Sequence, residues 1–132
     1  MRTGYPEKVK LEAEFEATET APREARALVR RQMIDLVPAT TLADVLTVVT
    51  ELVDNAVRHG EGTGVQLRLQ VLTDTVTGEV ESIGVAEIEY VAPRVQDLRG
   101  LGLHIVNAIA SDWEVVRSAG ALNVVRFEVA FA

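Results

Sequence analysis

A glutamate and an asparagine lie four residues apart in the segment ELVDNAVRHG, residues 51–60. At 3.6 residues per turn, Glu51 and Asn55 share one face of a helix and are separated by about 6 Å along its axis. The pair has two interpretations, half of a nucleotide-binding site or a solvated polar face. Periodicity alone favours the solvated face, because the pair lies opposite the apolar stripe of the helix, beside Asp44 and Arg58.

Two glycines, Gly100 and Gly102, lie at the start of the segment RGLGLHIV, which has a helical pattern. Glycines at the start of a helix let a ligand approach the unpaired backbone N–H groups, where the helix dipole also favours negative charge. The same glycines would equally allow close packing against the helix that carries Glu51. Both interpretations remain open at this point.

Other kinds of catalytic centre have little support. The chain contains no cysteine, and its two histidines, His59 and His104, have no partners at metal-ligand spacing, so a zinc site is not expected. The G-x-S-x-G element of acyl-transfer enzymes is absent. The glycines of GEGTG are followed by a strand pattern, not by the Lys-Ser/Thr and helix of a phosphate-binding loop. We interpret His104 as a helix-surface residue and Trp113 as part of the core.

Length, composition and charge indicate one globular domain. The chain has 132 residues, of which 48% are hydrophobic and 25% charged, so we expect a single domain over residues 1–132. A formal net charge of −7 disfavours nucleic acid as a partner, although backbone N–H groups and a metal ion can still hold a small anionic ligand. No apolar run resembles a signal peptide or a membrane span, so we expect a soluble, cytoplasmic protein without a membrane partner.

Hydrophobic periodicity predicts eight elements in the order strand, helix, helix, strand, strand, helix, strand, strand. Thr20 is expected to cap the first helix, and Gly60 to end the second. The polar segment TDTVTGEVES, residues 73–82, is interpreted as a long hairpin connection. The order indicates an α/β two-layer sandwich, in which a mixed, mainly antiparallel sheet carries three helices on one face. The predicted elements cover residues 9–17, 20–36, 41–59, 65–71, 83–91, 101–110, 112–118 and 123–131.

Two features bear on protein partners. Arg23, Arg26 and Arg30 fall on one stripe of the first predicted helix, where a solvated face is the favoured interpretation and a docking patch for an acidic partner is the alternative. The edge of the first predicted strand could also pair with a second copy of the chain, which would give a homodimer.

The combination of ELVDNAVRHG with RGLGLHIV about forty residues later resembles the N box and the second glycine box of the GHKL ATPases, which include gyrase and histidine kinases. Within that superfamily the chain is most similar to the small bacterial anti-sigma-factor serine kinases and to single-domain ATP-binding regulators of actinobacteria. The resemblance implies that Glu51 is the general base and that Asn55 holds the Mg²⁺ of ATP. It also implies that Gly100 and Gly102 approach the phosphates. In the kinases of this group the acceptor is a serine on an antagonist protein, and the same domain sequesters a sigma factor. The resemblance therefore implies a sigma factor or an anti-anti-sigma factor as the partner.

Three positions depart from the pattern of this family. Tyr90 stands where the family has an aspartate that accepts a hydrogen bond from adenine. Leu98 replaces a glycine of the second box, and Asn123 stands where the family often has a threonine on the adenine side. The sequence therefore supports two functions. One is an ATP–Mg²⁺-binding regulator of the anti-sigma-factor type, with possible serine kinase activity, and the other is a nucleotide-free interaction module with the same fold.

Overall fold

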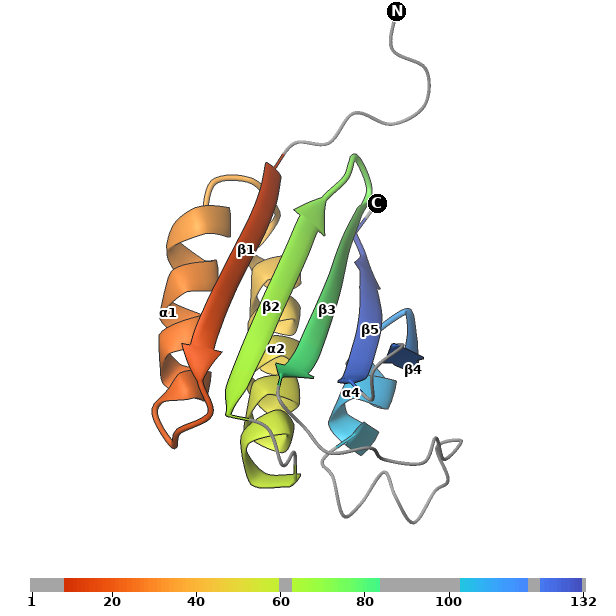
Figure 1. Ribbon diagram of the computed structural model, residues 1–132. Helices are drawn as coiled ribbons and strands as arrows, with labels where there is room; N and C mark the ends of the chain where they lie inside the picture. The colour runs from red at the N-terminus through yellow and green to blue at the C-terminus, as the bar shows by residue number, and fades with distance from the viewer. Residues whose placement is uncertain (1–8, 60–62, 84–102, 119–121, 132) are drawn as a thin grey trace, which may run out of the picture.

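The computed structural model describes residues 9–59, 63–83, 103–118 and 122–131, and in this part of the chain three helices cover one face of a five-stranded sheet (Figure 1). The predicted two-layer sandwich and the order of its elements are confirmed. Gly60 lies outside the described residues, so the predicted cap at this position stays a prediction. The elements are β1 (Val9–Glu16), α1 (Ala21–Met33), α2 (Ala39–His59), β2 (Gly64–Val71), β3 (Thr75–Ile83), α4 (Leu103–Ile109), β4 (Asp112–Ser118) and β5 (Leu122–Ala130).

The strands follow the order β1-β2-β3-β5-β4, and every ladder between the described strands is antiparallel. Side chains alternate between the two faces, as the period of a strand requires. In β2, Val65, Leu67 and Leu69 are buried on the helix side, while Gln66 and Arg68 are half-buried on the outer side. The helices therefore cover an apolar face and leave a polar face outside.

The position of β3 differs from the prediction. β3 occupies most of the segment that was interpreted as a hairpin connection, and residues 72–74 alone join it to β2. The segment is polar because its outer side chains include Glu79 and Glu81, which form ion pairs with arginines on the neighbouring strands. Such a strand can be half-buried without a continuous apolar pattern. Beyond Ile83, the predicted strand of residues 83–91 lies outside the described residues.

Gly78 lies in the middle of β3 because a neighbouring ring occupies the space of a side chain. A Cβ atom on Gly78 would lie 2.4 Å from Cζ of Phe127 and 2.6 Å from Cδ2 of Leu69. Phe127 is directly opposite Gly78 on β5 and is one of the most deeply buried side chains of the core. Gly78 therefore leaves room for the ring of Phe127, on the neighbouring strand β5, to lie over β3.

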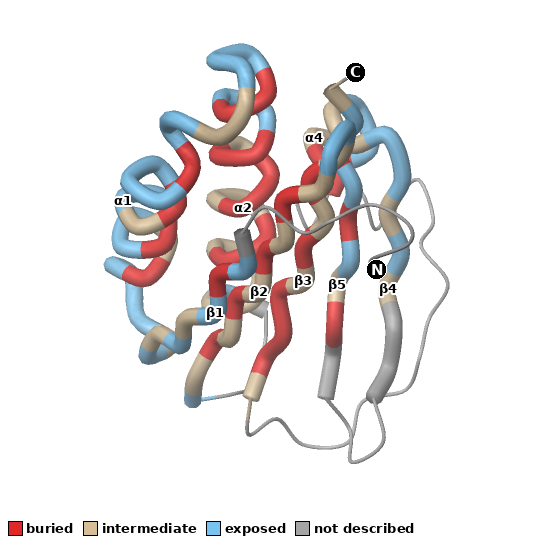
Figure 2. Tube along the Cα trace, turned by 90° about the horizontal axis from the view of Figure 1, so that it is seen from above, coloured by how far each residue is buried: buried red, intermediate tan, exposed pale blue. Residues whose placement is uncertain are grey.

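The helices pack on the sheet through regularly spaced apolar residues. In α1 the buried residues recur every four positions, and the opposite side of the helix is exposed (Figure 2). α2 lies between α1 and α4 (Figure 1) and contributes most of the helical core. No helix in the described ranges is long and apolar enough to cross a membrane. The core residues of α2 are Leu42, Val45, Leu46, Val48, Val49, Leu52 and Val53.

The start of α1 differs in detail from the prediction. Thr20 precedes the helix, but its side chain accepts no hydrogen bond from a backbone N–H group of the first turn. Instead, its hydroxyl donates to the carboxylate of Glu24 over 2.7 Å. The reason is the backbone of Thr20, which is helical (φ −86°, ψ −12°), whereas capping residues usually have an extended conformation.

Candidate functional site

Asn55 lies about one turn before the end of α2, at the border of its buried face. Val48, seven residues earlier, is fully buried, and seven residues bring a side chain to within about 20° of its starting direction around a helix. The expectation that Asn55 lies opposite the apolar stripe is therefore wrong. The buried stripe of α2 is wider than the sequence pattern indicated. It includes Val48, and Asn55 lies two turns further along the same side.

The side-chain carbonyl oxygen of Asn55 is buried, and it accepts no hydrogen bond from any residue that the structure describes. A buried acceptor without a partner costs about 1–3 kcal/mol, and native structures contain few such groups. The amide oxygen is a hard ligand of the kind that Mg²⁺ prefers. Asn55 therefore fits the role of a metal or hydrogen-bond ligand, which a merely solvated asparagine would not.

Glu51 lies one turn before Asn55 and is half-buried. Within the described ranges it makes no hydrogen bond or ion pair. The neighbouring acid, Asp54, differs, because its carboxylate accepts a hydrogen bond from Nε of Arg58 over 3.1 Å. Glu51 is thus the carboxylate on this part of α2 that remains available to orient or deprotonate a hydroxyl group.

Four elements meet at the edge of the sandwich that contains this end of α2. Figure 1 shows the end of β3, the start of β5 and α4 at the same edge. Ser82 is a buried polar residue near the end of β3, and it pairs with Asn123 of β5. On α4, Leu103 and Val106 are buried in the core. The elements at this edge thus carry buried apolar residues on α4 and polar residues on α2 and β3.

The remaining predicted site residues are covered only in part. Tyr90, Gly100 and Gly102 lie outside the described residues, as does Leu98, and they fall in the sequence between the end of β3 and the start of α4. Asn123 is placed within β5, and its side chain lies outside the description. The structure therefore places Glu51 and Asn55 on one face of α2, and the contributions of Tyr90, Gly100, Gly102 and Asn123 stay predictions.

The two residues that the sequence assigned a structural role behave as expected. His104 is exposed on α4. Trp113 is half-buried and packs against the core, and its indole N–H donates to Oδ1 of Asn107 over 3.0 Å.

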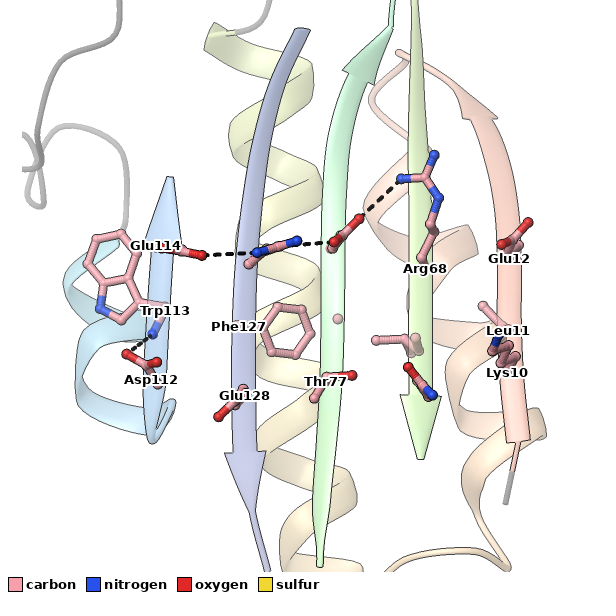
Figure 3. A pocket seen from close by; sticks show the side chains of 15 residues that line it. Lys10, Leu11, Glu12, Arg68, Thr77, Asp112, Trp113, Glu114, Phe127 and Glu128 are labelled. Carbon is pink, nitrogen blue, oxygen red and sulfur yellow. Dashed lines mark hydrogen bonds and ion pairs between the residues drawn. The ribbon is translucent and has the colours of Figure 1, made fainter. Parts of the chain in front are cut away.

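A cavity of about 400 Å³ lies on the outer face of the sheet, away from the helices (Figure 3). Charged side chains of alternating sign cross this face in one row, each directly opposite the next in the strand register. In order from β1 to β4, the residues of this row, which we term the charge row, are Glu12, Arg68, Glu79, Arg126 and Glu114.

The two arginines of the charge row form ion pairs with Glu79 and Glu114 of the row and with the neighbouring Glu81. Arg68 donates to Glu81 over 2.8 Å and lies 3.4 Å from Glu79, while Arg126 lies 3.0 Å from Glu79 and 3.2 Å from Glu114. The hydrogen bond with Glu81 raises the pKa of Arg68, and those with Glu79 and Glu114 raise the pKa of Arg126. Among the described residues, no group of three or more acidic or histidine side chains could hold a metal ion. The polar outer face is therefore a weaker candidate than the edge at Asn55.

The sequence matches the family of histidine kinase-like ATPase domains over residues 11–129. The chain therefore belongs to this family, which confirms the resemblance to the GHKL ATPases. No curated protein matches the sequence.

Among solved structures, the fold is similar to the crystal structure of the RsbU and RsbW domains of Rv1364c from Mycobacterium tuberculosis. The TM-score is 0.72 and the sequence identity is 21%, with 95% of this chain and 34% of that chain covered. At this identity the similarity establishes the fold. This chain thus spans about a third of the length of the matched chain.

Proposed function

We propose that the protein is a regulator of the anti-sigma-factor type that binds ATP–Mg²⁺ at the edge formed by α2, β3, β5 and α4, and that it phosphorylates a partner protein on serine. The observation that carries the proposal is the buried carbonyl oxygen of Asn55, which lacks a hydrogen-bond donor among the described residues. Membership of the histidine kinase-like ATPase family supports the nucleotide. The similarity to a structure that contains an RsbW domain motivates the regulatory role.

Each predicted residue has a distinct role in this proposal. Asn55 would hold Mg²⁺ through its amide oxygen, and the remaining metal ligands would be phosphate oxygens and water. Mg²⁺ supplies neutralisation of the phosphate charge. Gly100 and Gly102 would let the backbone approach the phosphates, while Tyr90 and Asn123 would lie on the adenine side.

Glu51 would act on the acceptor. Its carboxylate orients the serine hydroxyl of the partner and accepts its proton, while the serine oxygen forms a bond to the γ-phosphorus and the bond to ADP breaks. A sigma factor or an anti-anti-sigma factor in the cytoplasm is the partner class that the family resemblance suggests.

The rival function is a nucleotide-free interaction module, which the departures at Tyr90, Leu98 and Asn123 motivate. The environment of Asn55 favours nucleotide binding instead. A domain without a ligand would gain about 1–3 kcal/mol of stability by replacing an unpaired buried acceptor with an apolar residue. An asparagine at this position is more easily explained by a ligand that completes its hydrogen bonding or coordination.

Thermal unfolding with and without ATP and Mg²⁺ separates the two functions. With free ligand at a hundredfold excess over its Kd, the proposal predicts a gain of about 2.7 kcal/mol in the free energy of unfolding. Asn55→Ala should remove this gain. Asp44→Ala should keep it, because Asp44 is exposed on the same helix three turns earlier. No stabilisation of the wild-type protein by millimolar ATP would contradict nucleotide binding and favour the rival.

A further inference from the structure

The side of β3 that faces the helices changes from apolar to polar at Ser82. Alternate residues of the strand face this way, and all of them are buried: Val76, Gly78, Val80 and Ser82. The two valines suit the apolar core, and Gly78 leaves room for the ring of Phe127. The packing of the core does not account for a hydroxyl group at Ser82, which is only 6% exposed.

The hydroxyl of Ser82 makes no hydrogen bond within the described ranges. The strand register places Ser82 between Val65 of β2 and Asn123 of β5. Val65 is fully buried and offers no polar side-chain atom. A buried polar group without a partner costs about 1–3 kcal/mol, so a ligand that supplies the partner would explain a serine at this position.

Two other buried polar residues occur in the described part of the chain, and their positions differ from that of Ser82. Glu81 faces the outer side of the sheet, where it accepts a hydrogen bond from Arg68 over 2.8 Å. Thr41 lies in the first turns of α2, about 21 Å from Asn55 along the helix axis. Ser82 lies near the end of β3, and this end of the strand is at the same edge of the sandwich as the last turns of α2 (Figure 1).

The surroundings of Ser82 suit an aromatic base better than a phosphate group. A buried phosphate needs cations or several N–H donors around it. The side chains next to Ser82 on the inner face of the sheet are those of Val65 and Val80, and the adjoining residue in the chain, Glu81, is acidic. Apolar walls with a few placed polar groups are typical of sites that bind flat organic rings.

We propose that Ser82 forms a hydrogen bond with the base of the nucleotide, and that the site therefore accepts purine nucleoside triphosphates with either an amino group or a keto oxygen on the six-membered ring. This inference rests on nucleotide binding at the edge formed by α2, β3, β5 and α4. A serine hydroxyl carries one donor and two acceptor lone pairs, and it rotates to suit its partner. It can accept a hydrogen bond from the amino group of ATP or donate one to the keto oxygen of ITP.

Titration of the full chain with three nucleotides tests the proposal on the wild-type protein. The probes are ATP, ITP and purine riboside triphosphate, which has no exocyclic group on its base, each with Mg²⁺. We expect the affinities for ATP and ITP to agree within about threefold, because each base forms one hydrogen bond with the same hydroxyl. Purine riboside triphosphate should bind about tenfold more weakly, because the hydroxyl then has no partner.

Substitutions at Ser82 identify the group that contacts the base. Ser82→Ala should weaken the binding of ATP and ITP about tenfold and leave that of purine riboside triphosphate unchanged. Ser82→Asp should weaken ITP relative to ATP by about tenfold or more, because an ionised carboxylate only accepts hydrogen bonds. Ser111→Ala is the control. The hydroxyl of Ser111 donates to the carbonyl oxygen of Glu128 on β5, about 17 Å along the strand from Asn123, so this variant should bind all three nucleotides like the wild-type protein.

The outcomes separate this inference from the proposed function. Binding of ATP by the wild-type protein with affinity for ITP at least tenfold lower would overturn the inference and leave nucleotide binding intact. Equal weakening of all three nucleotides by Ser82→Ala would show a structural effect and would also overturn it. The wild-type titrations decide the question even if Ser82→Asp does not fold. Absence of binding for every nucleotide would contradict the proposed function itself, and the inference with it.

Discussion

Val48 and Asn55 lie two turns apart on the same side of α2, and the fully buried valine is followed along this side by an asparagine whose carbonyl oxygen is buried without a donor among the described residues. The buried face of α2 thus continues from Val48 to the polar side chain of Asn55. This relationship distinguishes Asn55 from the solvated asparagine that the sequence pattern favoured. It also leads to a prediction about stability in the absence of any ligand.

Replacing Asn55 by leucine should stabilise the ligand-free protein. The substitution removes a buried acceptor that has no donor among the described residues, so the free energy of unfolding should rise by about 1 kcal/mol. Urea denaturation of wild-type and variant proteins measures this change. Destabilisation of similar size would show that the amide oxygen has a donor in the free protein, and it would remove the main support for a ligand at this position.

Glu51→Gln should separate binding from catalysis. The amide keeps the size of the side chain but accepts no proton, so phosphotransfer to the partner should fall by a factor of about 10²–10⁴ while ATP affinity is unchanged. Transfer of the radioactive γ-phosphate to a candidate partner, together with a binding titration, measures both. Glu14→Gln on the exposed side of β1 is the control. Equal transfer by the two variants would refute the role of Glu51.

Gly78→Ala should destabilise the sheet. The new methyl group would lie 2.4 Å from the ring of Phe127, so either the ring or the strand must move. Overpacking of this kind costs about 1–3 kcal/mol. Chemical denaturation should show this loss of stability. Thr77→Ala, at the preceding position, whose side chain lies on the outer face, should show a smaller loss. If Gly78→Ala were as stable as wild type, the account of the close packing between β3 and β5 would be wrong.

The charge row predicts unequal effects for its two arginines. Arg68→Met leaves Glu81, whose side chain is 11% exposed, without its partner, at a cost of about 1–2 kcal/mol. Arg126→Met should cost less than Arg68→Met, because it frees Glu114, which is 60% exposed and readily hydrated. Adding Glu81→Gln to Arg68→Met should recover part of the loss. Equal losses from the two single variants, measured by urea denaturation, would contradict this account.

The sequence predicted the sandwich because period-two and period-3.6 patterns mark most of its elements. β3 was misplaced, since Gly78 and the paired glutamates give it the composition of a turn, and the partners that compensate for them, Phe127, Arg68 and Arg126, come from other strands. The assignment of Glu51 and Asn55 to the N box rests on the resemblance to the GHKL ATPases, and it stays a prediction. The burial of the Asn55 oxygen depends on the tertiary packing around α2, and the hydrophobic periodicity of the sequence gives no information about that packing.

Calorimetric titration of the protein with ATP and Mg²⁺ tests the central claim most directly, with Asn55→Ala as the comparison. We expect saturable binding to the wild-type protein that requires Mg²⁺ and disappears in the variant. Absence of binding to the wild-type protein at millimolar ATP, or undiminished binding to Asn55→Ala, would contradict the assignment of this edge of the sandwich as the nucleotide site.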